Sequence, residues 1–432
     1  MKKNKKLNIA IVGLGNIGLN LYRHLAKNRK SIIEKNNINF EVKYVSAKNK
    51  NKKRRINIPK KKWLKNYLLA SQLSDVDVVV ELIGGAEGAA KKLVFSAIKN
   101  KKHVITANKA LISKYGDQLA LLAEKKKVNL EFEAAVAGGI PIIRTLKEGL
   151  VANKTSRIYG ILNGTSNYIL SNMDRMKMDF KSVLDKAKKL GYAESNPKSD
   201  LNGEDVKSKI QILTALAFNS FINKSKINLE GINNIDEIDI KNAEILGYKI
   251  KHLGLSEIEN GKLIQRVHPC LIKKESRISN VNGVLNAVII EGKPIGKSIL
   301  QGEGAGPGPT TSALVSDICS VLRGNIKFPF SVSNSNRKKI MSSDLSEKIF
   351  SSYIRLDGID KKGVLSSITK TMSKNKISVK RLIQNPFKRK KFASIVIISH
   401  KAKNKNLVKC IKQLKNNNFI LKNPKFIRIE EI

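Results

Sequence analysis

Among the charged residues of 191–209, Glu194, Asp200 and Asp205 are acids that lie close to Lys209 in the chain. Lys209 follows Asp205 by four residues. If a helix opens just before Asp205, then Asp205 and Lys209 stand one turn apart on one face of that helix. Such a pair is either an ordinary surface ion pair or a reactive site, in which a carboxylate holds a polar substrate beside an ammonium that moves a proton. The elements around the segment must decide between these interpretations.

The composition is that of a globular protein with several domains. A chain of 432 residues predicts two or three domains, and 41 % hydrophobic residues are enough for packed cores. A net charge of +47 is typical of a protein with a polyanionic partner. However, the lysines are spread through every segment, and the chain has few aromatic residues on which bases could stack. We therefore expect no nucleic-acid partner, with a basic nucleic-acid-binding protein as the alternative from another class.

The cysteines and the apolar segments favour a cytoplasmic protein without a membrane span. Cys270, Cys319 and Cys410 have neither a disulfide pattern nor metal-ligand spacing, which indicates a reducing compartment. The first apolar run, 7–12, contains Asn8 and leads into glycines, so we interpret it as a strand and not as a signal peptide. No run of about 18 apolar residues occurs, so no transmembrane helix is expected.

The first third of the chain alternates between strand and helix patterns. Strands are expected at 7–12, 40–47, 76–83, 103–106 and 128–133, and helices at about 19–35, 87–100 and 115–126. This alternation predicts an α/β fold with a Rossmann-type, doubly wound parallel sheet.

A glycine motif, GLGNIG at 13–18, follows the first strand and opens the first helix. Glycines at Gly13, Gly15 and Gly18 let the backbone approach a pyrophosphate, while N–H groups at the helix start face the anion. The same residues could form a simple tight turn. Their position between a strand and a helix favours a dinucleotide site.

Basic residues follow the second strand, where NAD sites usually carry an acid. Ser46 and Ala47 lead into Lys48, and further cations follow up to Arg55. Because cations attract a 2′-phosphate, we expect NADP(H) to be the preferred cofactor. NAD(H) is the alternative, if these residues form only a solvated basic loop.

Beyond residue 137 the pattern becomes a mixed α+β one. Long helices are expected around 165–190 and 203–220, strands at 262–272 and 284–291, and a helix at 310–323 after a Gly/Pro-rich turn. Polar residues at 331–349 predict a linker. The last segment predicts a βαββαβ order, with strands at 351–356, 377–383, 391–399 and 425–430 and helices at 363–374 and 404–416. The expected domains are 1–137 for nucleotide binding, 138–325 for catalysis and dimerisation, a linker at 326–350, and 351–432.

Five segments resemble homoserine dehydrogenase and occur in that family's order. They are TANKAL (106–111), EFEAAVAGGIPII (131–143), GILNGTSNYIL (160–170), GYAESNPKSDLNGEDVKSK (191–209) and GEGAGPGPTTSALVSDI (302–318). The resemblance implies an NAD(P)-dependent, reversible interconversion of L-homoserine and L-aspartate 4-semialdehyde, in the biosynthesis of threonine, methionine and isoleucine. Another NADP-linked amino-acid dehydrogenase is the nearest alternative, but it would share only the nucleotide domain and would lack the 191–209 segment.

The resemblance also implies roles for single residues. Glu194 and Asp205 would bind the substrate, and Asp200 would lie close to it. Lys209 would donate and accept the proton, and Lys109 would be a second lysine near the nicotinamide. We rank Lys209 above Lys109 as the group that transfers the proton. The implied cofactor contacts are Gly13, Gly15, Asn16, Ile17, Gly18, Lys48, Ile83, Lys109, Gly191 and Gly306.

The resemblance further implies a monovalent-cation site, for Na⁺, on the loop that leaves the nucleotide domain. Its residues would be Glu133, Val136, Gly138 and Ile140, whose oxygens suit a hard cation. The alternative is a glycine-rich loop that holds no ion. In one departure from the family's Asp-Pro-Thr, the chain has Asn-Pro-Lys at 196–198, which removes an acid near the substrate residues.

Residues 351–432 resemble an ACT domain, most clearly at YIRLDGIDKKGVLSSITKTMSKNKISVKRLIQ (353–384). In homoserine dehydrogenases with this module, the implied ligand is threonine, acting as a feedback inhibitor. Lys362 replaces the usual proline before Gly363. The alternative is therefore a structural or dimerising module without regulation. The resemblance also implies a homodimer or homotetramer.

Overall fold

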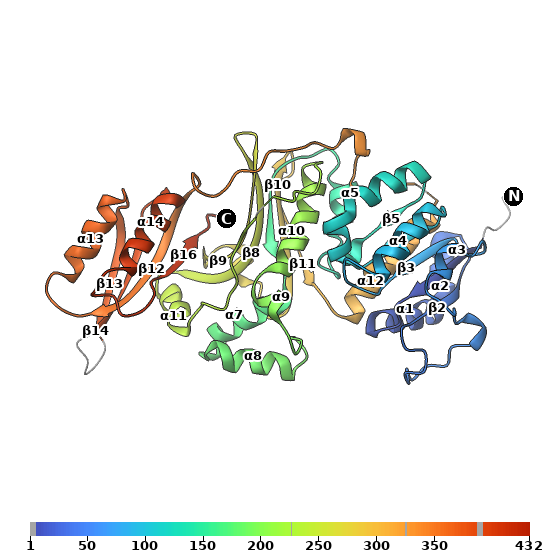
Figure 1. Ribbon diagram of the computed structural model, residues 1–432, viewed down its shortest axis with the longest axis horizontal. Helices are drawn as coiled ribbons and strands as arrows, with labels where there is room; N and C mark the ends of the chain where they lie inside the picture. Colours follow the sequence, from blue (N-terminus) through green and yellow to red (C-terminus); the bar gives the residue numbers. More distant parts are fainter. Residues whose placement is uncertain (1–5, 226, 325, 387–391) are drawn as a thin grey trace. The chain divides into compact units, whose positions relative to one another are not determined.

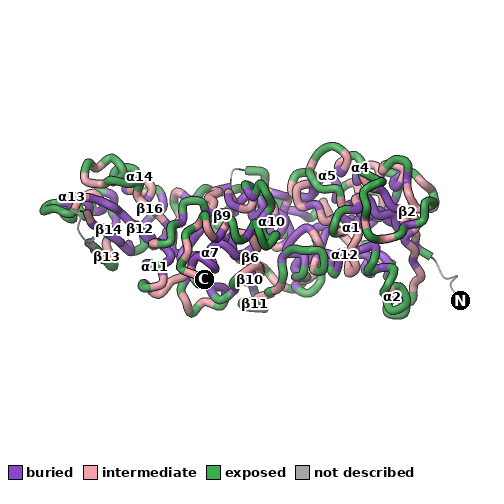
Figure 2. Tube along the Cα trace, turned by 90° about the horizontal axis from the view of Figure 1, so that it is seen from below, coloured by how far each residue is buried: buried purple, intermediate pink, exposed green. Residues whose placement is uncertain are grey.

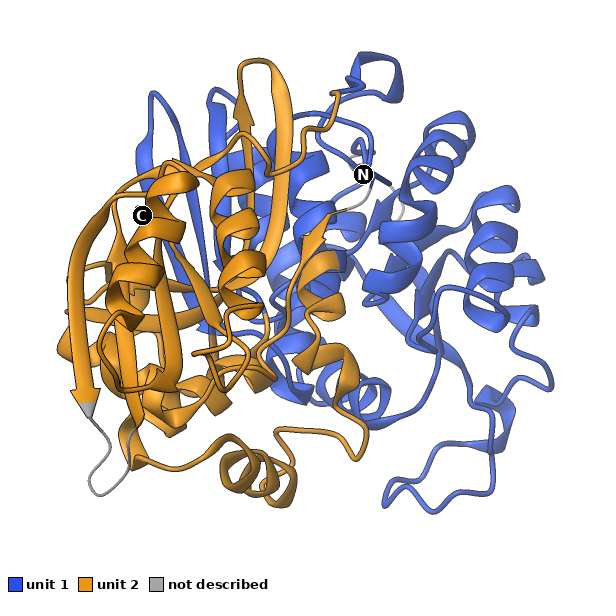
Figure 3. Cartoon of the chain, turned by 60° about the vertical axis from the view of Figure 1, so that its left-hand side comes forward, with its two compact units in different colours: residues 1–162, 208–225, 286–340 blue, residues 163–207, 226–285, 341–432 orange. Residues whose placement is uncertain are grey.

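The computed structural model describes residues 6–225, 227–324, 326–386 and 392–432, so the basic residues 1–5 lie outside it. The chain forms two compact units (Figure 3). The first contains 1–162, 208–225 and 286–340, and the second contains 163–207, 226–285 and 341–432.

The first unit contains the predicted parallel sheet. Its strand order is β2 (Phe40–Ser46), β1 (Leu7–Val12), β3 (Val78–Glu81), β4 (His103–Thr106) and β5 (Leu130–Glu131), and all pairs are parallel. The chain winds outward in opposite directions from β1 and β3. Ligands of such sheets bind at the carboxyl ends of the strands beside this switch. Figure 1 shows β2, β3 and β5 of this sheet among helices α1, α4 and α5. The Rossmann-type fold of this unit is thus confirmed.

Helices cover this sheet, and a late segment of the chain completes its core. The helices are α1 (Asn16–Lys27), α2 (Arg29–Asn36), α3 (Leu69–Gln72), α4 (Ala89–Lys99), α5 (Lys109–Lys126) and α12 (Pro307–Leu322). Leu314 and Ile318 of α12 pack in one core with Ile9 and Ile11 of β1 and Leu21 of α1. The strands are almost continuously apolar because both of their faces are covered. Figure 2 shows this contrast between buried strands and the largely exposed α2.

Two predicted helices in this unit have different bounds. The single helix expected at 19–35 is divided at Asn28, whose backbone angles (φ −102°, ψ 14°) depart from helical geometry. The helix expected at 115–126 begins at Lys109, because the Asn108 side chain accepts from the Leu111 N–H and caps its first turn.

The rest of the first unit is an antiparallel set of strands with short helical turns. Its strands run in the order β11 (Gly296–Glu303), β10 (Leu285–Lys293) and β6 (Lys154–Ile161). The turns are η1 (Lys60–Lys62), η2 (Glu133–Ala135), α6 (Ile142–Arg144), η3 (Thr145–Gly149) and η5 (Asn334–Asn336). Of these strands, β6 and β11 were not among the predicted elements.

The second unit combines helices with a long mixed sheet. Its helices are α7 (Gly164–Met176), α8 (Phe180–Lys189), α9 (Lys198–Leu201) and α11 (Glu237–Ile245). Its first strands are β7 (Asn228–Leu229), β8 (Tyr248–Glu259) and β9 (Lys262–Lys273). The turn η4 (Arg277–Asn280) follows β9. The helical stretch expected around 165–190 is two helices, because Lys177 is left-handed (φ 52°) and Asp179 caps α8. Helix α10 (Glu204–Ala217) starts in this unit and ends in the first.

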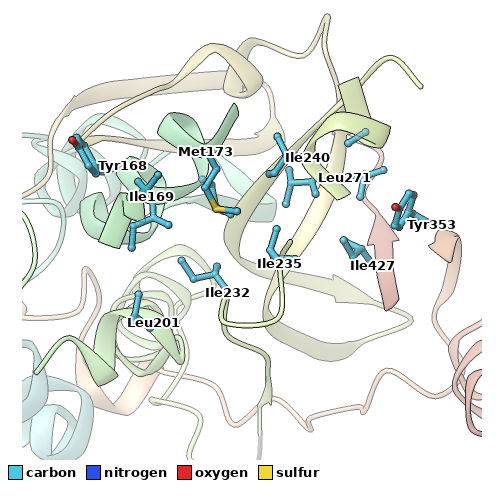
Figure 4. Packing of buried hydrophobic residues seen from close by; sticks show 14 of the residues in the cluster. Tyr168, Ile169, Met173, Leu201, Ile232, Ile235, Ile240, Leu271, Tyr353 and Ile427 are labelled. Atoms are coloured by element: carbon cyan, nitrogen blue, oxygen red, sulfur yellow. The ribbon is translucent and has the colours of Figure 1, made fainter. Parts of the chain in front are cut away.

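The C-terminal segment has the predicted strand and helix order. It comprises β12 (Ile349–Ile359), α13 (Val364–Lys374), β13 (Val379–Pro386), β14 (Phe392–Ser399), a short β15 (Ala402–Lys403), α14 (Asn404–Lys415) and β16 (Lys425–Ile429). Its strands run β16-β12-β14-β13, and β16 also pairs in parallel with β9, placing Ile429 beside Leu271. Tyr353 and Ile427 accordingly share a core with Ile169, Met173 and Leu271 (Figure 4).

In the described ranges, no helix is both long enough and apolar enough to cross a lipid bilayer.

Candidate active site

Each glycine of the 13–18 loop meets a separate steric need. Gly13 has φ +109°, and a Cβ on it would lie 2.3 Å from the Leu82 carbonyl oxygen. A Cβ on Gly18 would lie 2.2 Å from the Gly13 carbonyl oxygen, so α1 packs directly against the loop. A Cβ on Gly15 would have no described atom within 4 Å. The loop is therefore tight at its two ends and open in the middle, as pyrophosphate binding requires.

The first turn of α1 presents backbone N–H groups beside that opening. The helix begins at Asn16, and its N-cap, Gly15, offers no side chain that could accept from them. The N–H groups of a first turn have no acceptor within their own helix, so those of Asn16, Ile17 and Gly18 can bind an anion.

Arg54 ties the basic segment after β2 to the glycine loop. Its Nε lies 3.4 Å from the Leu14 carbonyl oxygen, and its guanidinium stacks 5.3 Å from the ring centroid of Trp63. Its remaining nitrogens donate to carbonyls of residues 49–52 and so fold this segment around it. Lys48 is exposed on the same segment. The structure thus places at least one cation beside the glycine loop.

Asn163 joins two of the predicted substrate residues in the second unit. Its Nδ2 donates to Asp200 Oδ1 at 2.8 Å and to Asp205 Oδ2 at 2.8 Å. Its Oδ1 accepts from the Ser166 N–H at 2.7 Å and caps α7. Asp205 is buried, whereas Asp200 is half-buried. One amide therefore holds two carboxylates close together at the start of a helix.

Helix α10 begins at Glu204, as the 191–209 pattern predicts, with Asp205 in its first turn and Lys209 one turn later. Lys209 is only 7 % exposed, and its Nζ donates to the Leu162 carbonyl at 2.6 Å. A surface ion pair would leave both side chains in solvent. Because Asp205 and Lys209 are both buried, they are not an ordinary surface ion pair.

A buried histidine braces the turn that leads into α10. Gly203 has φ +88°, and a Cβ on it would lie 3.4 Å from the His252 ring. The His252 ring nitrogens contact the Glu230 carbonyl oxygen at 3.0 Å and the Ser166 hydroxyl at 3.4 Å. Complete burial lowers the pKa of His252 to about 4. The ring is therefore neutral at physiological pH.

The predicted cation loop contains a buried acid. The Glu133 carboxylate accepts from the Ile143 N–H at 2.9 Å and the Arg144 N–H at 2.7 Å, and burial raises its pKa to about 7. Its own N–H donates to Asp317 Oδ2 at 3.0 Å, and burial also raises the pKa of Asp317. Gly138 donates to the Gly304 carbonyl, so the loop runs beside the 302–308 turn. In the described parts of the chain, no group of three or more His, Cys, Asp or Glu residues is arranged as a metal site.

The other predicted contacts lie on loops or helix ends. Glu194 and Ile83 are exposed on loops. Gly191 has φ +75° just after α8, where a left-handed glycine ends a helix, and Gly306 has φ +108° as the N-cap of α12. Lys109 is half-buried as the first residue of α5.

The sequence reasoning did not select Asn163, although it lies in one of the quoted segments. Its signal was an asparagine just before a helix pattern that opens Gly-Thr-Ser, which is typical of an N-cap. A capping role alone would not have predicted the contacts to Asp200 and Asp205, which come from residues far along the chain.

Comparisons with known proteins give one consistent result. The family model for the homoserine dehydrogenase NAD binding domain matches residues 13–133, and that for homoserine dehydrogenase matches residues 141–319. A homoserine dehydrogenase of Neisseria gonorrhoeae is 39 % identical over 437 residues and covers 99 % of both chains. One from Bacillus subtilis is 34 % identical over 400 residues, 92 % of both chains. The crystal structure of a homoserine dehydrogenase from Thiobacillus denitrificans has a TM-score of 0.92 at 34 % identity and covers 99 % of both chains.

Proposed function

Because the chain belongs to the homoserine dehydrogenase family, we propose that its 191–209 segment binds L-homoserine or L-aspartate 4-semialdehyde for NAD(P)-dependent hydride transfer. The observation that carries this proposal is the joining of Asp200 and Asp205 by Asn163 at the start of α10, with buried Lys209 one turn later. The direct test is absorbance at 340 nm with homoserine and either NADP⁺ or NAD⁺. No reduction of either cofactor would contradict the proposal.

The carboxylates are assigned to substrate binding. Homoserine carries an ammonium, and carboxylates gathered at one place favour binding of a cation. Asp205 is held in position by burial and by Asn163, whereas exposed Glu194 lies where it can meet an incoming substrate. Fixing the substrate in this way orients its alcohol carbon for reaction.

Lys209 is assigned to proton transfer and Lys109 to a supporting position. In the oxidative direction, a bound nicotinamide would supply the acceptor for the hydride of the alcohol carbon. In that direction Lys209 would take the hydroxyl proton as the neutral amine, and in reduction it would give the proton back as the ammonium. The hydrogen bond to the Leu162 carbonyl fixes the position of Nζ. Lys109 starts α5 at the carboxyl edge of the parallel sheet, where the nicotinamide of a Rossmann domain lies.

The cofactor is proposed to be NADP(H), bound along the 13–18 loop and contacted also by Lys48, Ile83, Gly191 and Gly306. The contact of Arg54 with Leu14 supports this preference, because it sets a guanidinium beside the loop that would receive the adenosine half. NAD(H) is the alternative.

A Na⁺ ion is proposed to bind the loop that contains Glu133, Val136, Gly138 and Ile140. Carbonyl oxygens suit such an ion, and the buried Glu133, with the Asp317 carboxylate beside its backbone N–H, would add acidic groups near it. Replacing Na⁺ by tetramethylammonium at constant ionic strength should lower activity. Equal rates in both salts would contradict this assignment.

Residues 351–432 are proposed to form an ACT-like regulatory domain that binds threonine. The βαββαβ order and the Gly363 N-cap of α13 (φ 89°) support it, since an exposed helix start can receive a carboxylate. The alternative is a module that only stabilises the fold. We further propose the domains 1–137 and 138–325, a cytoplasmic location, and a homodimer or homotetramer, which light scattering of the purified protein would test.

A further inference from the structure

Glu81 is a buried acid at the end of β3, and the sequence reasoning assigned it no role. It is fully buried. Its Oε1 accepts from the Ile83 N–H at 2.7 Å and the Gly84 N–H at 3.1 Å, and its Oε2 accepts from the Thr106 hydroxyl at 2.6 Å. The two oxygens of one side chain therefore accept from two N–H groups and one hydroxyl.

A chain of hydrogen bonds runs from Glu81 back to the same loop. The Thr106 hydroxyl accepts from the Asn108 N–H at 3.0 Å. Asn108 caps α5 through the Leu111 N–H and donates from Nδ2 to the Gly85 carbonyl at 2.7 Å. The loop 83–85 is thus held at three successive residues, by Glu81 on one side and by Asn108 on the other.

This network lies at the switch point of the parallel sheet. Glu81 is in register with Val12 of β1 and with Thr106 of β4. The next residue, Leu82, donates to the Val12 carbonyl at 2.8 Å, and its own carbonyl is the atom that Gly13 closely approaches. Any shift of the 83–85 loop would therefore reach both the glycine loop and the first turn of α5, where Lys109 lies.

An acidic side chain at this buried position would destabilise the fold if it served only to fill space. Burying an unpaired charge is unfavourable, and within the described residues no Lys, Arg or His forms an ion pair with Glu81. A carboxylate does, however, supply strong acceptors for two N–H groups and one hydroxyl at once, in a fixed geometry. We propose that Glu81 is a positioning residue for the dinucleotide: it fixes loop 83–85 and Lys109 against each other where the nicotinamide half binds.

This inference rests on the proposed function, and Glu81→Gln tests it with little change in volume. In that variant an NH2 group replaces one of the two acceptor oxygens. Either the Thr106 hydroxyl or the N–H groups of Ile83 and Gly84 then lose their acceptor. The Kd for NADPH should rise about tenfold, which the loss of one hydrogen bond to a charged group produces. Energy transfer from Trp63, the single tryptophan, to NADPH measures that Kd without any turnover. At saturating cofactor, kcat should fall while the KM for homoserine stays unchanged.

Glu87→Gln is the matched control, because Glu87 follows the same loop and its contacts, among the described residues, are with Lys91, Lys114 and Tyr115 at the surface. If Glu81→Gln fails to fold, the pair Thr106→Val and Thr106→Ser decides: Val should weaken NADPH binding, and Ser should restore it. The inference is overturned if Glu81→Gln binds NADPH with the wild-type Kd. It is also overturned if Thr106→Val and Thr106→Ser bind NADPH with the same Kd as the wild type. A wild type that binds NADPH but does not oxidise homoserine would instead refute the proposed function.

Discussion

Asn163 Nδ2 lies 2.8 Å from Asp205 Oδ2, and the same nitrogen also reaches Asp200. Strand β6 ends at Ile161, and Leu162 and Asn163 are the next two residues. The Leu162 carbonyl accepts a hydrogen bond from Lys209 Nζ. Two neighbouring residues of one strand end therefore fix the groups proposed for substrate binding and for proton transfer.

We expect Asn163→Ser to raise the KM for homoserine about tenfold, because serine is too short to hold both carboxylates. Serine still caps a helix, so the cost to the free energy of unfolding should come from the lost hydrogen bond to buried Asp205, about 1–3 kcal/mol. Asn163→Ala, which loses the cap as well, should cost about 1 kcal/mol more. Steady-state kinetics and urea denaturation of the two variants separate the effects. An unchanged KM in both would show that Asn163 is only a cap.

Lys209→Met should lower kcat by at least about 100-fold, the usual contribution of a positioned proton-transfer group. Binding of NADPH should be unaffected. Lys109→Met should have a smaller effect on kcat and a larger one on the KM for the cofactor. Lys207→Met, on the same helix but paired at the surface with Glu204, is the control. If Lys109→Met loses more turnover than Lys209→Met, the two roles must be exchanged.

The preference for NADP⁺ should depend on Arg54 and Lys48. We expect Arg54→Gln to raise the KM for NADP⁺ about tenfold, since the loss of one phosphate-binding cation is worth about 1–2 kcal/mol. The KM for NAD⁺ should change little, because NAD⁺ has no 2′-phosphate. Lys53→Gln, an exposed cation on the same segment, is the control. A wild-type preference for NAD⁺ would contradict the cofactor assignment itself.

His252 should make stability depend on pH. Its pKa is lowered from 6.5 to about 4 in the folded protein, so the unfolded chain binds the proton first as pH falls. The stability due to neutral His252 is complete above pH 6.5 and is lost as pH falls through about 4, by about 3 kcal/mol in total. His252→Gln keeps a donor for the Glu230 carbonyl but does not titrate. Urea denaturation between pH 4 and 7 should therefore give the variant a shallower slope, and parallel slopes would refute this.

Threonine should inhibit turnover and raise the thermal midpoint if the C-terminal domain is regulatory. The expected midpoint rise is a few degrees at saturating ligand, because a ligand that binds only the folded state stabilises it. Isoleucine at the same concentration is the control ligand. No change in rate or midpoint with millimolar threonine would leave this domain a structural role only. That role has its own support in the pairing of β16 with β9.

Many elements of the fold could be predicted from the residues that form them. Strand-helix alternation, the 13–18 glycines and the βαββαβ order are local patterns, and they predicted elements that the structure contains. The start of α10 just before Asp205 was predicted in the same way. These features depend on residues close together in the chain, where periodicity, capping and turn glycines act.

The side chains that come into contact, in contrast, depend on the packing of remote segments. Asn163 reaches Asp200 and Asp205 from 37 and 42 residues away, and Glu81 reaches Thr106 from 25 residues away. Strand β16 pairs with β9, and α12 completes the core around β1. No pattern of neighbouring residues predicts either of these contacts. Such contacts depend on where remote strands end and on which polar groups remain to be satisfied once the core is packed. The acids and lysines of 191–209 could thus be chosen from the sequence, but the residues that hold them in place could not.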